Sequence, residues 1–363
     1  MYDKKRPYND LPKLPPKHDF DDVVLLKLVN KANIALSSFN GTSKILPSRT
    51  VILEPLTVKE AVASSGVENI NTTVSEVFRA ELFPAEEATK PQKETLHYKD
   101  ALVEGLRLVT RNGFLNTNNY IDLQGVLEPK KTGIRRKEQT KEPVRIENSV
   151  TGETIYTPPE GYDLICELLK NYEEYYNDFS NEDVIDPLIK LALLHYQFEA
   201  IHPFRDGNGR TGRILMVLYL VLAKRIDLPV LFLSGYILEH RDEYYRLLRG
   251  VTEEGKWKEW VMFILNAVIR QSKDTEETIM KIKTLMDAYK KMATKESLPN
   301  SSSFIDYMFS KPVYTYKDLS EKCDVHKNTA IKYLNDLSSK GVFKKTRFKK
   351  EAIFFYPEFI KLL

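Results

Sequence analysis

The chain has 363 residues and a net charge of +3, with 42% hydrophobic and 29% charged residues. This composition is ordinary for a globular protein long enough for more than one domain, and the charge is too small to imply a partner. The two cysteines, Cys166 and Cys323, lie far apart without CxxC spacing, which argues against a disulfide framework and a structural zinc site. The longest apolar run, 214–223, is about half the length that crosses a bilayer, and the first residues lack the apolar run of a secretory signal. We therefore expect a cytoplasmic protein with no membrane partner.

The chain opens with a proline-rich segment, which predicts an extended arm that we interpret as a strap on the surface. Its prolines are Pro7, Pro12, Pro15 and Pro16. From about residue 20 to 298 the pattern is predominantly helical. Asp21 and Asp22 give an acidic first turn to an amphipathic run, which predicts the first helix.

Local capping signals predict where the next helices begin and end. Thr57 with Glu60 forms one capping box, and Thr73 with Glu76 forms another, so we expect a helix to start at each. A periodic run ends at Asn112–Gly113, a typical helix stop.

One region interrupts the helical pattern between residues 130 and 157. Short β-branched runs (PVRI and ETIYT) alternate with turn signals at Thr132–Gly133 and Thr151–Gly152. We predict a β-hairpin beside the helical core. The basic residues of this region, Lys130, Lys131, Arg135, Arg136 and Lys137, are expected on a solvated face.

Two apolar helices are predicted around one polar loop. Asp186–Pro187 starts the first, whose sequence LIKLALLHYQFEAI is apolar nearly all round, and RTGRILMVLYLVLAK follows the loop 202–209. We expect both helices to be central and His195 to be a core histidine. The segment after about residue 298 differs: two short helices joined by a turn precede a strand-like run, an order typical of a small winged-helix domain.

The loop between these helices, HPFRDGNGRTGR (202–213), has the features of an anion-binding site. Gly207 and Gly209 free the backbone to approach a ligand closely. Because the second helix begins at about Asn208, its unpaired N–H groups face the same space. Arg210 and Arg213 lie three residues apart on the first turn and can hold phosphate oxygens. This arrangement suits a di- or triphosphate.

Two further residues of the loop add chemistry. Asp206 is its one carboxylate, and in so positive a site we expect it to hold Mg²⁺ against the phosphates. His202 follows the first central helix and can take a proton from an incoming hydroxyl at neutral pH.

The string 202–213 resembles the Fic family signature HxFx(D/E)GNGRxxR at every fixed position, and the similarity extends over about residues 54–268. The resemblance implies a mainly α fold: a Fic helical core with a β-hairpin flap, followed here by the small winged-helix domain. It implies His202 as general base, Phe204 as the core anchor of the loop and Asp206 as the metal ligand for ATP–Mg²⁺. The residues that would bind ATP are Gly207, Asn208, Gly209, Arg210, Arg213 and, as part of an adenine pocket, Tyr244. Tyr236 and Tyr245 are further candidates for that pocket.

A second match to the family lies earlier, at residues 64–69. Ser64, Glu68 and Asn69 fit the inhibitory motif (S/T)xxxE(G/N), with asparagine in place of the more usual glycine. The resemblance implies that Glu68 pairs with Arg213, so that ATP binds with its α-phosphate misplaced for attack. In some relatives the same glutamate serves AMP removal.

Together these features predict a protein adenylyltransferase, inhibited by Glu68, that moves AMP from ATP to a Ser, Thr or Tyr hydroxyl. The flap near Thr132–Arg136 would hold the target protein by backbone pairing. A deAMPylating enzyme, transfer of another nucleotide such as UMP, and a nucleotide-sensing DNA-binding regulator stay open, as does a homodimer. DNA binding would use basic residues around the wing, namely Lys340, Lys344, Lys345, Arg347, Lys349 and Lys350. The predicted domains are 1–50 (arm and first helix), 51–297 (Fic domain with its inhibitory helix) and 298–363 (winged helix).

Overall fold

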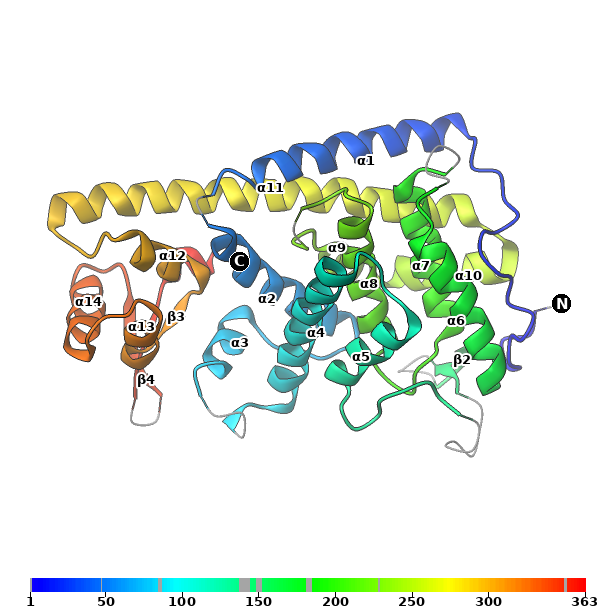
Figure 1. Ribbon diagram of the computed structural model, residues 1–363, viewed down its shortest axis with the longest axis horizontal. Coiled ribbons are helices and arrows are strands. Elements are labelled where there is room, and N and C mark those ends of the chain that lie inside the picture. The colour runs from blue at the N-terminus through cyan, green and yellow to red at the C-terminus, as the bar shows by residue number, and fades with distance from the viewer. Residues whose placement is uncertain are drawn as a thin grey trace. The chain divides into compact units, whose positions relative to one another are not determined.

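The structure is a computed structural model that describes residues 2–46, 48–83, 87–136, 144–147, 152–180, 185–227, 229–348 and 351–363. It is mainly α-helical and divides into two compact units, each of which combines separate parts of the chain. Unit 1 comprises residues 1–37 and 97–271, and unit 2 comprises residues 38–96 and 272–363. Three helices contribute residues to both units: α1 (Val23–Thr42), α4 (Lys90–Asn112) and α11 (Trp257–Glu296) (Figure 1).

Unit 1 is built around two adjacent apolar helices, α7 (Pro187–Ile201) and α8 (Asn208–Leu222), as the sequence predicts. Asp186 caps α7 through its side chain, and Glu199 is the one residue of α7 that is not buried. Helix α5 (Thr117–Leu127) packs on α8 and α6 (Tyr162–Asn177) on α7, while α10 (Arg241–Glu254) contacts both α7 and α9 (Leu233–Glu239). His195 is 1% exposed and stacks on Trp260, which confirms it as a core histidine.

The predicted hairpin is present in unit 1 as two short antiparallel strands. They are β1 (Ile146–Glu147) and β2 (Thr154–Tyr156). Residues 132–136 form no hairpin strand: Ile134 makes an isolated bridge with Phe204 instead, so the flap expected near Thr132–Arg136 is displaced along the chain. Residues 137–143 and 148–151 lie outside the described residues.

Unit 2 contains α2 (Arg49–Val67) and α3 (Val74–Ala80). Thr73 and Glu76 form the predicted capping box at the start of α3. The helix start expected at Thr57 is wrong, since α2 begins two turns earlier and contains Pro55. Thr57 and Glu60 are each 1% exposed, so burial in unit 2 overrides the local capping signal.

The C-terminal part of unit 2 consists of short helices and one small sheet. The helices are α12 (Ser302–Ser310), α13 (Tyr316–Lys322), α14 (Lys327–Ser339) and α15 (Pro357–Ile360). The antiparallel sheet has the order β3-β5-β4, formed by β3 (Val313–Tyr314), β5 (Glu351–Phe355) and β4 (Lys344–Phe348). Val58, Val77, Phe78, Val313 and Ile353 form one buried apolar cluster, so α2 and α3 share a core with this sheet.

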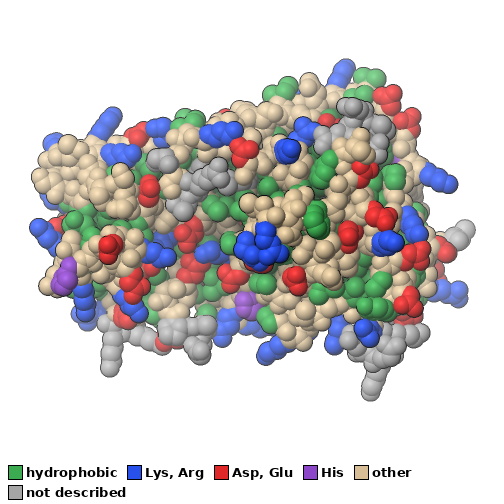
Figure 2. Space-filling model, in the orientation of Figure 1, with side chains coloured by type: hydrophobic (Ala, Val, Ile, Leu, Met, Phe, Trp, Pro, Cys, Tyr) green, Lys and Arg blue, Asp and Glu red, His purple; other side chains and the backbone are tan. Residues whose placement is uncertain are grey.

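Charged side chains of both signs are interspersed on the face shown in Figure 2, in keeping with the small net charge. Within the described residues, no helix is both long enough and apolar enough to span a bilayer.

Candidate active site

The loop that joins α7 to α8 is shaped by two residues in the left-handed conformation. His202 ends α7 with a φ of 48°, and its N–H bonds the carbonyl of Phe198 at 3.0 Å. Gly207 precedes α8 with a φ of 78°. A Cβ atom at Gly207 would also lie 3.3 Å from the Cγ of Glu128, so both backbone and space favour glycine there.

Asn208 holds the loop in this shape through its side chain. Its Oδ1 accepts a hydrogen bond from the N–H of Phe204 at 2.8 Å, and its Nδ2 donates to the carbonyl of Phe204 at 2.9 Å. Phe204 is fully buried and packs against Phe198, as expected for an anchor of the loop. Asn208 therefore fixes the loop before any ligand binds.

The first turn of α8 presents hydrogen-bond donors in one place. The N–H groups of residues 208–210 precede the first intrahelical bond, which Thr211 donates to Gly207 at 2.9 Å. Arg210 is 4% exposed, and its Nε and Nη1 atoms are buried with no hydrogen-bond partner among the described residues. Arg213 is 2% exposed. The structure thus places both predicted arginines at the predicted helix start, with donors suited to an anion.

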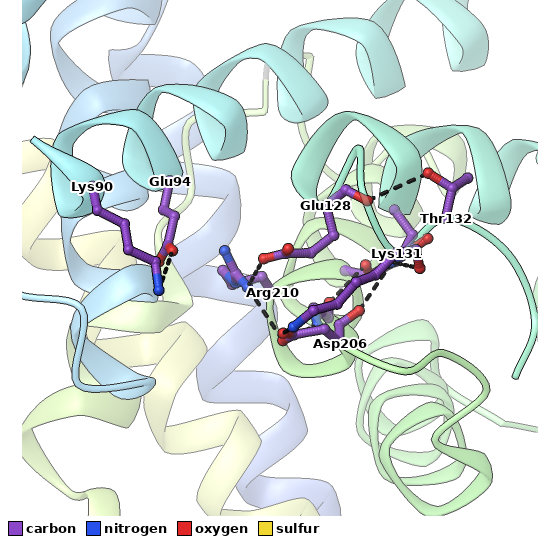
Figure 3. Close-up of polar contacts among 10 residues, drawn as sticks. Lys90, Glu94, Glu128, Lys131, Thr132, Asp206 and Arg210 are labelled. Atoms are coloured by element: carbon purple, nitrogen blue, oxygen red, sulfur yellow. Dashed lines mark hydrogen bonds and ion pairs between the residues drawn. The ribbon is translucent and has the colours of Figure 1, made fainter. Parts of the chain in front are cut away.

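Two carboxylates, those of Glu128 and Asp206, lie against Arg210. Arg210 Nη2 pairs with Glu128 Oε1 at 2.7 Å and lies 3.7 Å from Asp206 Oδ1. Lys131 also pairs with Asp206, as Figure 3 shows. Partial burial alone would raise the pKa of Asp206, yet the hydrogen bond from Lys131 and further positive partners hold it below its ordinary value. Asp206 is therefore ionised at neutral pH.

A glutamine on α5 joins the loop to the segment before the hairpin. Gln124 is fully buried, and its Nε2 donates to the carbonyls of Asp206 at 3.0 Å and Lys131 at 3.2 Å. The N–H of Gly133 donates to its Oε1 at 3.1 Å. The sequence offered no signal for Gln124 or Glu128, because both reach the loop only through the fold.

Arg135 contacts the backbone of His202. Its Nε donates to the carbonyl of His202 at 2.8 Å, and its Nη2 donates to the carbonyls of Pro159 at 2.5 Å and Ile201 at 3.3 Å. It is 5% exposed, and burial lowers its pKa to about 10. The expectation that Arg135 lies on a solvated face is therefore wrong, since it serves carbonyls that end α7. Its neighbour Arg136 is exposed.

The tyrosines proposed for the adenine pocket are placed differently from one another. Tyr244 is 1% exposed, and its hydroxyl lies 2.9 Å from His195 Nε2 within the core. Tyr245 instead lines a mostly apolar cavity of about 70 Å³ beside the last turn of α7. Tyr236 stacks on His240.

The residues predicted to form the inhibitory motif belong to unit 2 and lie at the end of α2. Ser64 is fully buried. Glu68 follows the last residue of α2, and its N–H bonds the carbonyl of Ser65 at 3.0 Å. Asn69 has a φ of 61°, the left-handed conformation in which asparagine can replace glycine. The backbone at residue 69 is therefore compatible with the predicted motif, in which either glycine or asparagine follows the glutamate.

Three family models match successive parts of the chain. The Fic/DOC family N-terminal model matches residues 26–107, and the Fic/DOC family model matches residues 114–220. A third, the C-terminal domain of SoFic-like protein adenylyltransferase, matches residues 285–359.

Curated relatives are similar to part of the chain. Protein adenylyltransferase Fic of Aedes aegypti is 30% identical over 167 residues, which are 45% of this chain and 30% of that protein. Protein adenylyltransferase fic-1 of Caenorhabditis elegans is 35% identical over 106 residues, which are 29% of this chain and 19% of that protein. The chain thus spans less than a third of the length of these two relatives.

Solved structures share the fold. A Fic family protein from Desulfovibrio desulfuricans has a TM-score of 0.58 at 18% identity, with 94% of this chain and 98% of that chain covered. Fic-1 from C. elegans has a TM-score of 0.53 at 20% identity, with 69% and 72% covered.

Proposed function

Since the chain belongs to the Fic/DOC family, we propose that it is a protein adenylyltransferase, which moves AMP from ATP to a hydroxyl side chain of a target protein. The observation that carries this proposal is the group of donors at the start of α8. Buried, unpaired nitrogens of Arg210 lie beside the N–H groups of the first helical turn, and a triphosphate supplies the acceptors that they lack.

The proposal includes Mg²⁺ bound with ATP. Asp206 fits a metal because its carboxylate is ionised and partly exposed, in a loop fixed by Asn208. No cluster of three or more His, Cys, Asp and Glu side chains that could hold a metal occurs among the described residues. The ion would therefore take its other ligands from phosphate oxygens and water, and it would neutralise phosphate charge.

The chemistry follows from the order of groups along the loop. The oxygen of the target hydroxyl forms a bond to the α-phosphorus of ATP while His202 accepts its proton. The bond between the α-phosphorus and the oxygen that leads to the β-phosphate breaks, and pyrophosphate leaves with the electron pair. Arg210, Arg213 and the α8 N–H groups stabilise the charge on the phosphates. The hairpin β1–β2 would offer its edge to the target segment.

Inhibition by Glu68 is part of the proposal and is supported by the motif at residues 64–69. The test is incubation with ATP labelled at the α-phosphate, with Mg²⁺, followed by measurement of label on protein. We expect strong labelling of Glu68→Gly, weak labelling of the native chain, and none when His202→Ala is added to Glu68→Gly. If the native chain and Glu68→Gly both bind ATP but neither labels any protein, this result would contradict transfer and favour AMP removal or nucleotide sensing.

A second candidate function, nucleic-acid binding, is favoured by a groove in the C-terminal part of unit 2. A depression of about 620 Å³ lies between α13, the start of α14 and the strands β4 and β5. Its basic lining residues are Lys317, Lys327, Lys345 and Arg347, against two acidic ones, Glu321 and Glu351. The helices and β4–β5 have the element order of a winged helix, so we propose that this groove contacts a phosphate backbone.

The groove can be tested through the salt dependence of duplex DNA affinity. Binding that falls steeply with salt, with a shallower slope for Lys345→Ala with Arg347→Ala, would support it. Lys361→Ala, an exposed lysine paired with Glu358 outside the groove, is the control. Equal slopes for all three forms would contradict the proposal.

A further inference from the structure

Residues 2–14, here called the strap, are fastened along unit 1 by hydrogen bonds to the segment that follows β2. The N–H of Tyr8 donates to the carbonyl of Thr157 at 3.0 Å, and the Thr157 hydroxyl donates to the carbonyl of Lys4 at 2.7 Å. The N–H of Glu160 donates to Asn9 Oδ1 at 2.8 Å. The predicted arm is thus a strap with a defined path.

The two ends of the strap are held unequally. Leu11 and Leu14 are 5% and 6% exposed, and Asn171 exchanges two hydrogen bonds with the backbone of Leu14, at 2.8 and 3.0 Å. The other end contains no buried residue, and it is held by the hydrogen bonds to Thr157 and by the ion pair of Lys4 with Glu153, whose side chains are 39% and 64% exposed. Since residues 2–9 lack a buried anchor and an exposed ion pair contributes little, this end can lift while Leu11 and Leu14 stay in place.

Tyr2 is the strap residue that lines the cavity of about 70 Å³. Its ring stacks on Tyr156, with 6.3 Å between centroids and an interplanar angle of 21°, and Tyr8 meets its edge at 5.2 Å. Burial raises the pKa of Tyr2, so its hydroxyl stays protonated. The remaining volume is far below the roughly 300–1,000 Å³ of small-molecule sites. The Tyr2 ring therefore closes one side of an apolar slot, where it packs against the rings of Tyr156 and Tyr8.

This slot adjoins the candidate active site. Its lining includes Glu199 and Ala200, which come just before His202, and Tyr245 and Leu248 of α10. The hydroxyl of Tyr156 donates to the carbonyl of Ala200 at 2.8 Å, which ties the slot to the end of α7. A planar ring that replaced Tyr2 would thus lie one helical turn from the loop that carries the anion site.

We propose that the strap is a removable closure of this slot, in which the ring of Tyr2 occupies the place that the base of the bound nucleotide takes when residues 2–9 lift away. This inference rests on the proposed function and adds a second level of control. When the base displaces the ring of Tyr2, the stacking contact between Tyr2 and Tyr156 is lost. Loss of the Tyr2 ring should therefore tighten nucleotide binding by roughly two- to tenfold, the range expected for one aromatic pair.

The experiment compares the native chain with Tyr2→Ala and, as a matched control that keeps the ring, Tyr2→Phe. Calorimetry with a non-hydrolysable ATP analogue and Mg²⁺ gives the affinities, and hydrogen exchange follows the strap amides. We expect tighter binding by Tyr2→Ala alone. In the native chain, the analogue should speed exchange of the Tyr8 amide, which bonds Thr157, and leave that of Leu14, which bonds Asn171, protected.

The outcomes separate this inference from the proposed function. If all three forms bind the analogue with equal affinity and the exchange rate of the Tyr8 amide does not change, the proposed role of the strap is overturned. Transfer of labelled AMP could still be observed in that case. The expected affinities without any transfer would support the strap and refute the transferase. Failure of every form to bind the analogue would overturn both.

Discussion

Asn208 and Phe204 exchange two hydrogen bonds across the loop, with donor–acceptor distances of 2.8 and 2.9 Å. A residue expected to cradle phosphate thus also ties the first turn of α8 to the buried anchor of the loop. Its side chain is part of the scaffold that aims the N–H groups of residues 208–210. The anion site is consequently formed before ligand binding, which avoids a cost of ordering the loop.

Replacement of Asn208 by alanine should therefore lower the rate of AMP transfer by more than its loss of stability explains. Loss of both bonds leaves the buried backbone groups of Phe204 unpaired, at a cost of about 1–3 kcal/mol in the free energy of unfolding. A looser loop should lower the rate of AMP transfer by roughly a hundredfold, measured in the Glu68→Gly background.

Asn177 provides the matched control for this variant. Its side chain makes the same pair of bonds with the backbone of Leu115, at 3.1 and 2.7 Å, away from the loop. We expect Asn177→Ala to lose comparable stability and to keep its transfer rate. Equal losses of transfer in the two variants would show that stability, rather than the loop, limits the reaction.

Arg135 should position His202 through the backbone. Its guanidinium serves three carbonyls at the end of α7 and near the hairpin, a fork that lysine cannot reproduce. We predict that Arg135→Lys lowers kcat by about tenfold, a rough figure for a shifted base, with a smaller change in KM for ATP. The control is Arg136→Lys, the same substitution at an exposed neighbour, which likewise keeps the positive charge. An equal effect of this variant on kcat would refute the positioning role of Arg135.

His195 should make the protein less stable in acid. Burial, together with the charge of Arg213, lowers its pKa from 6.5 to about 3. Between these values the unfolded chain binds a proton that the native protein does not, so the native state loses stability as the pH falls below 6.5. The slope from this group is about 1.4 kcal/mol per pH unit.

The measurement is urea unfolding of the native chain and of His195→Gln between pH 7 and pH 5. Glutamine can still hydrogen-bond the Tyr244 hydroxyl and does not titrate. The free energy of unfolding of His195→Gln should therefore fall less steeply with decreasing pH than that of the native chain. Parallel curves for the two proteins would show that another group sets the acid sensitivity.

Local chemistry made much of this fold predictable. Asp186 and Pro187 start α7, and Thr73 and Glu76 start α3, because each cap is completed within a few residues of the chain. The loop 202–213 was recognisable because its glycines, arginines and carboxylate are contiguous. Thr57 and Glu60 misled because a buried helix can run through a capping signal.

The supporting residues of the site were not predictable in this way. Gln124 bonds Asp206, and Arg135 bonds His202, over separations of 82 and 67 residues. Each is a common polar residue whose role appears only when the fold buries it beside the loop. The same holds for Tyr2, whose ring stacks on Tyr156 although the two residues lie far apart in the sequence.

Asn69 offers a graded test of inhibition. It follows Glu68 just beyond the end of α2 and has a φ of 61°, and the N–H groups of Glu68, Asn69 and Ile70 each donate a backbone hydrogen bond of 3.0 Å to this helix end. Alanine tolerates the left-handed conformation poorly, at a cost of roughly 1–2 kcal/mol, whereas glycine adopts it freely. Asn69→Ala should therefore loosen the segment that carries Glu68 and raise transfer of labelled AMP several-fold above the native level. Asn69→Gly should stay near the native level, and Glu68→Gly sets the upper limit. If Asn69→Ala lowers the stability of the protein but leaves transfer unchanged, the end of α2 does not control the reaction.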